Sequence, residues 1–196
     1  MRKTMWVAML ALCCVAVAQA QMGAMTPTVA VGSPADPAKE IDGMLTLFEQ
    51  ELMPAVKAMP AEKYSFAPSP AIFAAGQAVK FETVRTFAEQ VQHLAQANYS
   101  FYSRVGGMKP DVDVKAIAGM TKKDDLVAAM AASFAFAHKA VATITPENAF
   151  VTIKGADGMN TRATLATFGV AHGYDHYGQI VEYLRMNGIV PPASAK

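Results

Sequence analysis

Four long segments in which apolar residues recur every three or four positions dominate this sequence. Such spacing places apolar side chains on one face of an α-helix. Turn-forming segments separate the four patterns, and we see no internal repeat and no hairpin signal between alternating strands. Four helices of about 20 residues, each with one apolar face, bury those faces most simply in a four-helix bundle. The sequence therefore predicts an all-α fold.

The first two helices are expected at residues 37–56 and 81–105. Asp36 is placed to cap the first helix, and Pro37 takes the first helical position, where a missing N–H costs nothing. A proline-rich crossing joins the two helices, and Tyr64 and Phe66 can pack beneath it. The expected inward faces consist of Ile41, Met44, Leu45, Phe48, Leu52 and Val56 in the first helix and Phe81, Val84, Phe87, Ala88, Val91, Leu94, Ala95 and Tyr102 in the second.

The third helix is expected at residues 121–141, and the fourth begins at residue 160 or 161 and ends at 187. Thr121 and Asp124 resemble a capping box, with Asp in place of the usual Glu. Residues 150–154 have the composition of a strand, but a single short strand has no partner, so we expect a loop there. The inward face of the third helix consists of Leu126, Met130, Phe134, Ala137 and Val141.

The first 20 residues have the three parts of a secretory signal peptide. A positively charged start at Arg2 and Lys3 precedes an apolar run of about 14 residues, and Ala18-Gln19-Ala20 ends it with a small-x-small cleavage pattern. A transmembrane anchor is the alternative, but the run is shorter than the roughly 20 residues that a spanning helix needs. A lipoprotein is less favoured, because Leu12 and Cys13 poorly fit the small-residue position before a lipidated cysteine.

We therefore expect a periplasmic or secreted protein with no stable membrane span after the signal is removed. Residues 1–20 form the signal peptide, residues 21–35 a flexible leader with two prolines and two glycines, and residues 36–192 the helical domain.

Removal of the signal changes which chemistry the chain can perform. Without Arg2 and Lys3, 15 of the 17 basic residues remain, compared with 16 acidic residues. This balance, with no long run of either sign, argues against a nucleic-acid-binding surface. Cys13 and Cys14 also leave, so the mature chain has no disulfide, no thiol nucleophile and no thiolate ligand. All four histidines remain.

Two of these histidines, His172 and His176, lie four residues apart in the last helix. At about 100° per residue, both fall within roughly 20° of the line that joins Leu165 and Tyr183 on the inward face. This spacing offers two nitrogen ligands to one metal ion. The alternative is a pair of core histidines, but each ring then needs two hydrogen-bond partners. Gly173 follows His172, which excludes the H-E-x-x-H zinc-peptidase motif.

A third ligand must come from another helix, and His93 and His138 are the candidates. His93 lies roughly 160° from the mean direction of the apolar face of its helix, whereas His138 lies about 90° from its own. Periodicity alone therefore mildly favours His138, or leaves both side chains on the surface.

The last helix and two upstream segments resemble the DinB-like family. Residues 172–179 (HGYDHYGQ) fit the pattern H-x-x-x-H-x-G-Q of that family, and residues 183–192 resemble its closing tail. Residues 59–68 resemble its first crossing, and residues 87–95 resemble its second helix, including the histidine of its metal triad. The resemblance covers residues 37–192 in the right order.

The resemblance implies a four-helix bundle in which His93, His172 and His176 hold one divalent metal ion, and it thus favours His93 over His138. A bundle helix touches two neighbours, so a ligand on its flank can still reach the central cleft. One departure is Tyr177, where relatives often have Arg. The missing guanidinium removes any contact that it would make with an anionic substrate.

Three neutral imidazoles leave the ion its full charge and at least one open position, which is typical of a catalytic site. A bound water, or a substrate oxygen or sulfur, would be activated there. Imidazole suits Zn, Ni, Cu and Fe alike, so the donor set does not identify the metal. Characterised proteins that the chain resembles include transferases that use low-molecular-weight thiols and a thiol-dependent isomerase. Export from the reducing cytosol favours a hydrolase instead.

Two other functions stay open at this point: a non-catalytic bundle that binds a metal or a small molecule, and a homodimer with a structural metal. The expected partner is a small-molecule ligand or substrate, with no nucleic acid. No general base is identifiable. Four side chains near the histidine pair are candidate helpers, of which the helical wheel places Gln179 and Tyr183 inward, Asp175 at the edge and Tyr174 away.

Overall fold

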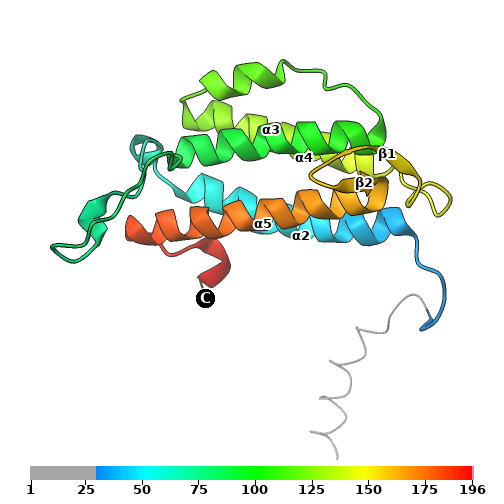
Figure 1. The fold of residues 1–196 in the computed structure, drawn as a ribbon, viewed down its shortest axis with the longest axis horizontal. Coiled ribbons are helices and arrows are strands. Elements are labelled where there is room, and N and C mark those ends of the chain that lie inside the picture. The colour runs from blue at the N-terminus through cyan, green and yellow to red at the C-terminus, as the bar shows by residue number, and fades with distance from the viewer. Residues whose placement is uncertain (1–29, 196) are drawn as a thin grey trace, which may run out of the picture. The chain divides into compact units, whose positions relative to one another are not determined.

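In the computed structural model, which describes residues 30–195, four long helices run alongside one another (Figure 1). They are α2 (Pro37–Ala58), α3 (Phe87–Gly106), α4 (Lys123–Val141) and α5 (Arg162–Met186). Both α2 and α3 pack against α4 and α5. The predicted all-α four-helix bundle is confirmed. The predicted signal peptide and most of the predicted leader lie outside the described residues.

Short 3-10 helices lie between and after the long helices: η1 (Ala61–Lys63) and η2 (Pro70–Ile72) before α3, η3 (Val114–Gly119) before α4, and η4 (Pro192–Ser194) after α5. Within residues 30–195, no helix has both the length and the apolar character that crossing a membrane requires.

Capping side chains set where the helices begin. The Asp36 carboxylate accepts a hydrogen bond from the Ala38 N–H, as predicted. The second helix was predicted to start at residue 81 but begins at Phe87, because Thr86 and Glu89 form a reciprocal capping box. The predicted cap at Thr121 is wrong. Lys122 is the N-cap of α4 and makes no side-chain capping bond, while the Lys123 ammonium group ties this end of α4 to the Met59 carbonyl.

The core lies between the four helices and follows the predicted apolar faces, except at Met44 on α2 and at Phe81, which lies before the start of α3 and packs on the Phe73 ring instead. Met44 is 47% exposed, because the buried arc of α2 faces α4 and α5 and leaves Met44 on the outer edge. The aromatic packing predicted under the proline-rich crossing is confirmed: Tyr64 is buried with its hydroxyl donating to the Val56 carbonyl, and Phe66 meets the Tyr183 ring at 5.6 Å between centroids.

A small hairpin replaces the loop that we predicted around residues 150–154. Strand β1 (Thr152–Ala156) pairs antiparallel with β2 (Met159–Thr161). Asp157 and Gly158 connect the strands with φ angles of 51° and 81°, as a two-residue type I′ turn requires, and Asp-Gly is a preferred pair there. The partner strand was missed because it has only three residues and runs directly into the capping box of α5 at Thr161.

Two glycines in α5 have opposite surroundings. At Gly173, helix α5 lies so close to α2 that a Cβ atom would overlap the ring of Phe48. That ring cannot move away easily, because it is 1% exposed and packs between Phe134 and Tyr174. At Gly178, by contrast, a Cβ atom would meet nothing within 4 Å.

We predict that Gly173→Ala lowers the free energy of unfolding by about 1–3 kcal/mol, because it overpacks the contact between α2 and α5. Gly178→Ala serves as the matched control and should raise stability by about 0.5–1 kcal/mol, because alanine loses less backbone entropy than glycine in a helix. Urea denaturation followed by circular dichroism measures both. Equal effects of the two substitutions would contradict the close approach at Gly173.

Candidate metal centre

Three histidines from two helices converge at the seam between α3 and α5. The candidate ligand atoms of His93, His172 and His176 all lie within 4.8 Å of one another. The Nε2 atoms of His93 and His172 are 3.1 Å apart. The centroid of the His176 ring lies 4.6 Å from the centroid of the His93 ring and 4.7 Å from that of the His172 ring. His176 is 5% exposed, and the other two are half-buried.

The antiparallel packing of α3 and α5 brings these rings together. Hydrogen bonds join the helices on both sides of the histidines: the Tyr102 hydroxyl donates to the Ala166 carbonyl at one end, and the Tyr183 hydroxyl donates to the Arg85 carbonyl at the other. His93 lies between these bonds on the flank of α3 that faces α5. A wheel centred on the apolar face missed His93 because that face averages the directions toward two neighbouring helices.

His138, which periodicity mildly favoured, lies elsewhere. It sits on α4, and its two ring nitrogens contact the carboxylates of Asp42 and Glu49 on α2. Burial by itself lowers the pKa of His138, but the hydrogen bonds and charges of the two carboxylates outweigh this effect and raise it. This histidine therefore links α2 to α4 and takes no part in the cluster.

A glutamine pair orients the most buried ring. The Nδ1 atom of His176 lies 2.8 Å from Oε1 of Gln90, and the side-chain amide of Gln90 donates to Oε1 of Gln179 at 2.7 Å. Because an amide oxygen only accepts, Nδ1 must carry the proton, and this leaves the lone pair on Nε2. Gln90 is 1% exposed. We did not predict its role, although it lies one turn before His93 on the same helix.

All three imidazoles favour the neutral form. Burial lowers the pKa of His93 to about 4, with further contributions from Arg85 and the other two rings. Burial and the His172 ring likewise lower the pKa of His176 to about 4, although Asp175 opposes them. The pKa of His172 is lowered by burial as well, against the nearby charges of Asp175 and Asp157. Neutral imidazole is the form that binds metal ions.

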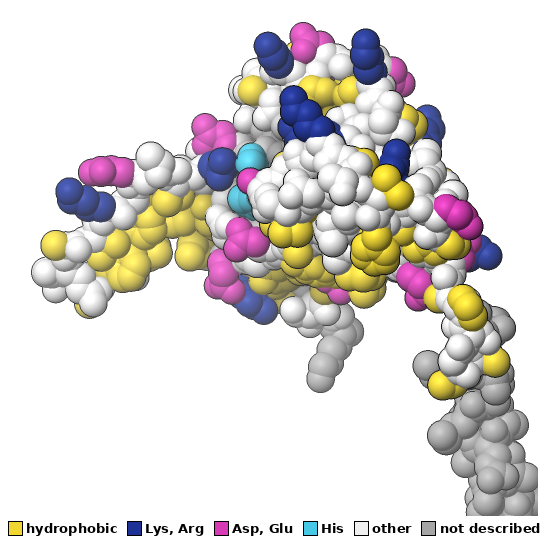
Figure 2. All heavy atoms as spheres, turned by 45° about the vertical axis from the view of Figure 1, so that its right-hand side comes forward, with side chains coloured by type: hydrophobic (Ala, Val, Ile, Leu, Met, Phe, Trp, Pro, Cys, Tyr) yellow, Lys and Arg dark blue, Asp and Glu magenta, His cyan; other side chains and the backbone are white. Residues whose placement is uncertain are grey.

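The cluster has an apolar side and a polar side. The Phe101 and Phe168 rings pack against His172, with centroids 5.4 and 6.0 Å away. On the other side, His93 lines a polar pocket together with Arg85. Figure 2 shows histidine side chains reaching the surface, with positively charged and acidic side chains beside them. The centre therefore lies at the edge of the bundle, within reach of solvent.

The four candidate helpers have different roles. Gln179 supports Gln90, and the Tyr183 hydroxyl is bound by the Arg85 carbonyl. Asp175 is exposed and lies near enough to affect the pKa of both histidines of α5. Tyr174 packs on Phe48 of α2 and does not face the cluster. Tyr177 packs against Tyr174.

The donor set fits a divalent metal ion. Two nitrogens bound to zinc at 2.0–2.1 Å with tetrahedral angles lie about 3.4 Å apart, and the Nε2 atoms of His93 and His172 are already 3.1 Å apart. The third ring offers its Nε2 lone pair, and its Nδ1–H is held by Gln90, which is the outer-shell contact typical of metal-bound histidine. The three histidines can therefore hold a metal ion.

The comparison with protein families agrees with this geometry. The sequence profile of the DinB superfamily matches residues 44–180, which is most of the chain and includes all three histidines. The chain belongs to this superfamily, as the resemblance of its motifs predicted. No curated protein sequence matches the chain.

We predict that, in metal-free protein at pH 5.5, the rings of His93 and His176 stay neutral while His138 is protonated. Histidines in the unfolded chain titrate near 6.5, so below that pH the unfolded chain binds protons that His93 and His176 do not bind in the folded protein. This difference lowers the free energy of unfolding as the pH falls from about 6.5 toward 4. Long-range ¹H–¹⁵N correlation spectra recorded with a chelator report each ring. Titration of His93 and His176 near 6.5 would contradict the buried cluster.

Proposed function

We propose that His93, His172 and His176 hold a divalent metal ion, zinc, nickel or iron, at which this exported protein acts on a small molecule as a hydrolase or transferase. The observation that carries the proposal is the convergence of three neutral imidazoles, one of them oriented by a buried glutamine pair. Hydrolysis is favoured over thiol transfer because residues 1–20 have the pattern of a secretory signal.

His93, His172 and His176 would hold a divalent ion through neutral imidazoles, and the ion would supply Lewis-acid chemistry toward a substrate oxygen or sulfur. The protein's own residues prepare this site. The hydrogen bond from His176 to Gln90 fixes the tautomer and the orientation of the ring. Phe101 and Phe168 shield the His172 side from water, while the half-buried rings of His93 and His172 leave an approach from solvent.

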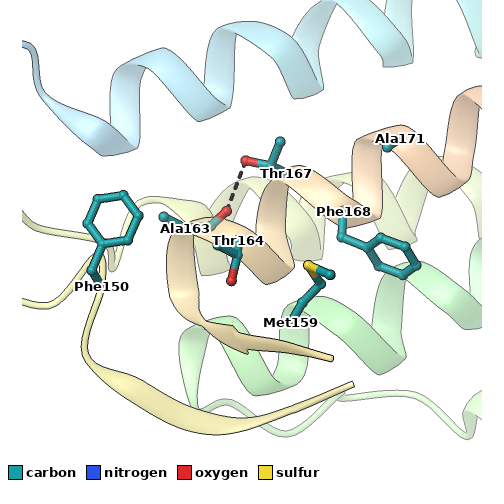
Figure 3. A pocket seen from close by; sticks show the side chains of 7 residues that line it. All are labelled: Phe150, Met159, Ala163, Thr164, Thr167, Phe168 and Ala171. Carbon is teal, nitrogen blue, oxygen red and sulfur yellow. Dashed lines mark hydrogen bonds between the residues drawn. The ribbon is translucent and has the colours of Figure 1, made fainter. Parts of the chain in front are cut away.

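A non-catalytic small-molecule carrier is the second candidate, and one observation favours it. A cavity of about 360 Å³ lies at the start of α5, lined by apolar and small side chains that include Phe150, Met159 and Phe168 (Figure 3). The Thr167 hydroxyl in this cavity is bound to the Ala163 carbonyl. The cavity has no acid or base in its lining, so it can bind an apolar group but cannot by itself perform general acid–base chemistry.

Elemental analysis of natively purified protein tests the metal site. We expect one divalent ion per chain in the parent, and none in His172→Ala and His176→Ala, because each change leaves too few ligands. His93→Ala should lose the metal as well. His138→Ala is the matched control and should keep the parent's metal content, since the ring nitrogens of His138 are bound to Asp42 and Glu49 and lie outside the cluster. Equal metal content in all five proteins would refute the site.

Metal removal separates catalysis from a structural role. We predict that a chelator leaves the helical circular dichroism signal intact, because the core residues around Leu45, Phe48 and Tyr102 are buried independently of the histidines at the seam. Turnover, screened with esters, amides and thiol conjugates, should disappear and return when metal is added back. Unfolding on chelation would instead assign the metal a structural role, and an intact, metal-loaded protein without turnover would favour the carrier.

A further inference from the structure

A polar pocket of about 350 Å³ opens beside His93, where the chain enters α3. Its volume lies within the range of small-ligand sites. Arg85 is the only positively charged residue in its lining, and the other polar side chains there include Glu89, Gln92 and Gln96. The pocket and the histidine cluster share His93 as a common wall, so one small molecule can reach both.

The side chains of Glu89, Gln92 and Gln96 in this lining already have hydrogen-bond partners. Oε2 of Glu89 accepts hydrogen bonds from the backbone N–H and the hydroxyl of Thr86. The side-chain amides of Gln92 and Gln96 donate to the carbonyls of Met120 and Val114. The first backbone N–H groups of α3 also have hydrogen-bond acceptors. Those of Phe87 and Ala88 donate to carbonyls in the preceding crossing, and that of Glu89 donates to the Thr86 hydroxyl oxygen.

Arg85 is different. Within residues 30–195, its guanidinium makes no ion pair and no hydrogen bond. Its backbone is nevertheless held in place, because its carbonyl accepts the hydrogen bond from the Tyr183 hydroxyl at 2.9 Å. Thr83, in the same lining, has a φ angle of 69°, which is unusual for a β-branched residue and typical of backbone that the surrounding structure constrains. The pocket thus presents one exposed cation without a partner, on a stretch of backbone that is held in place.

We propose that Arg85 binds a carboxylate of the substrate while the reacting group of the same molecule lies at the three histidines. This inference rests on the proposed metal site and specifies the substrate class as small carboxylic acids. The planar guanidinium matches the two oxygens of a carboxylate. A phosphate dianion fits less well, because a single cation faces it and the Glu89 carboxylate stands in the same lining.

The test uses the natively purified protein loaded with Co²⁺ and two probes of equal length, 3-mercaptopropionate and 3-mercaptopropionamide. Each thiol can bind the metal and change its absorption spectrum, but only the first carries a carboxylate. We expect the parent to bind the acid about tenfold more tightly than the amide, as one charge-assisted contact provides. In Arg85→Gln this preference should disappear, while Arg85→Lys should keep part of it.

Lys80→Gln is the matched control, because it removes a positive charge from the same connecting segment, where Lys80 is 3.9 Å from Glu82 and outside the pocket lining. It should keep the tenfold preference. If the Arg85→Gln protein takes up Co²⁺ like the parent but retains the preference, or if the parent shows none, the role of Arg85 is refuted while the metal site stands. If the parent takes up no Co²⁺, the proposed function fails, and the substrate assignment fails with it.

Discussion

The antiparallel contact between α3 and α5 is the interaction on which the rest of this structure depends. At one end, the Tyr102 hydroxyl donates a hydrogen bond to the Ala166 carbonyl, and at the other end the Tyr183 hydroxyl donates one to the Arg85 carbonyl. Between these two bonds, the side chains have little freedom to shift along the seam. His93 and Gln90 on one helix are therefore set opposite His172 and His176 on the other, close enough for three rings to share one ion.

Burial at this seam also sets the charge state of the histidines. Three imidazoles placed together in a bundle would repel one another if protonated, and desolvation penalises the charged form further. As a result, His93 and His176 stay neutral well below the usual titration range of histidine, and the pKa of His172 is lowered as well. His138 shows the opposite outcome in the same fold, because two carboxylates face it and favour the protonated ring. The neighbours of a histidine therefore decide whether its ring is neutral and able to bind a metal ion or protonated in an ionic link.

The fold was largely readable from the sequence, and the errors have specific physical causes. Apolar periodicity gave the four helices, but the start of α3 depended on the Thr86–Glu89 capping box rather than on the apolar pattern. The hairpin at residues 152–161 was missed because β2 has only three residues and merges with the cap of α5. The choice of His93 over His138 came from family resemblance, since the direction of a side chain on a helical wheel does not say which neighbouring helix it meets.

The sequence by itself determined the all-α class, the inward-facing pair His172 and His176 and the membership of the DinB superfamily, because each is encoded in local spacing or in a contiguous motif. Only the tertiary structure decided which side chains surround the histidines. Gln90 is hydrogen-bonded to His176, Asp42 and Glu49 are hydrogen-bonded to His138, and Arg85 lines the same pocket as His93. In three of the four cases, the partner lies 86 to 96 positions from its histidine in the sequence. Their proximity results from how whole helices pack, which local periodicity does not contain.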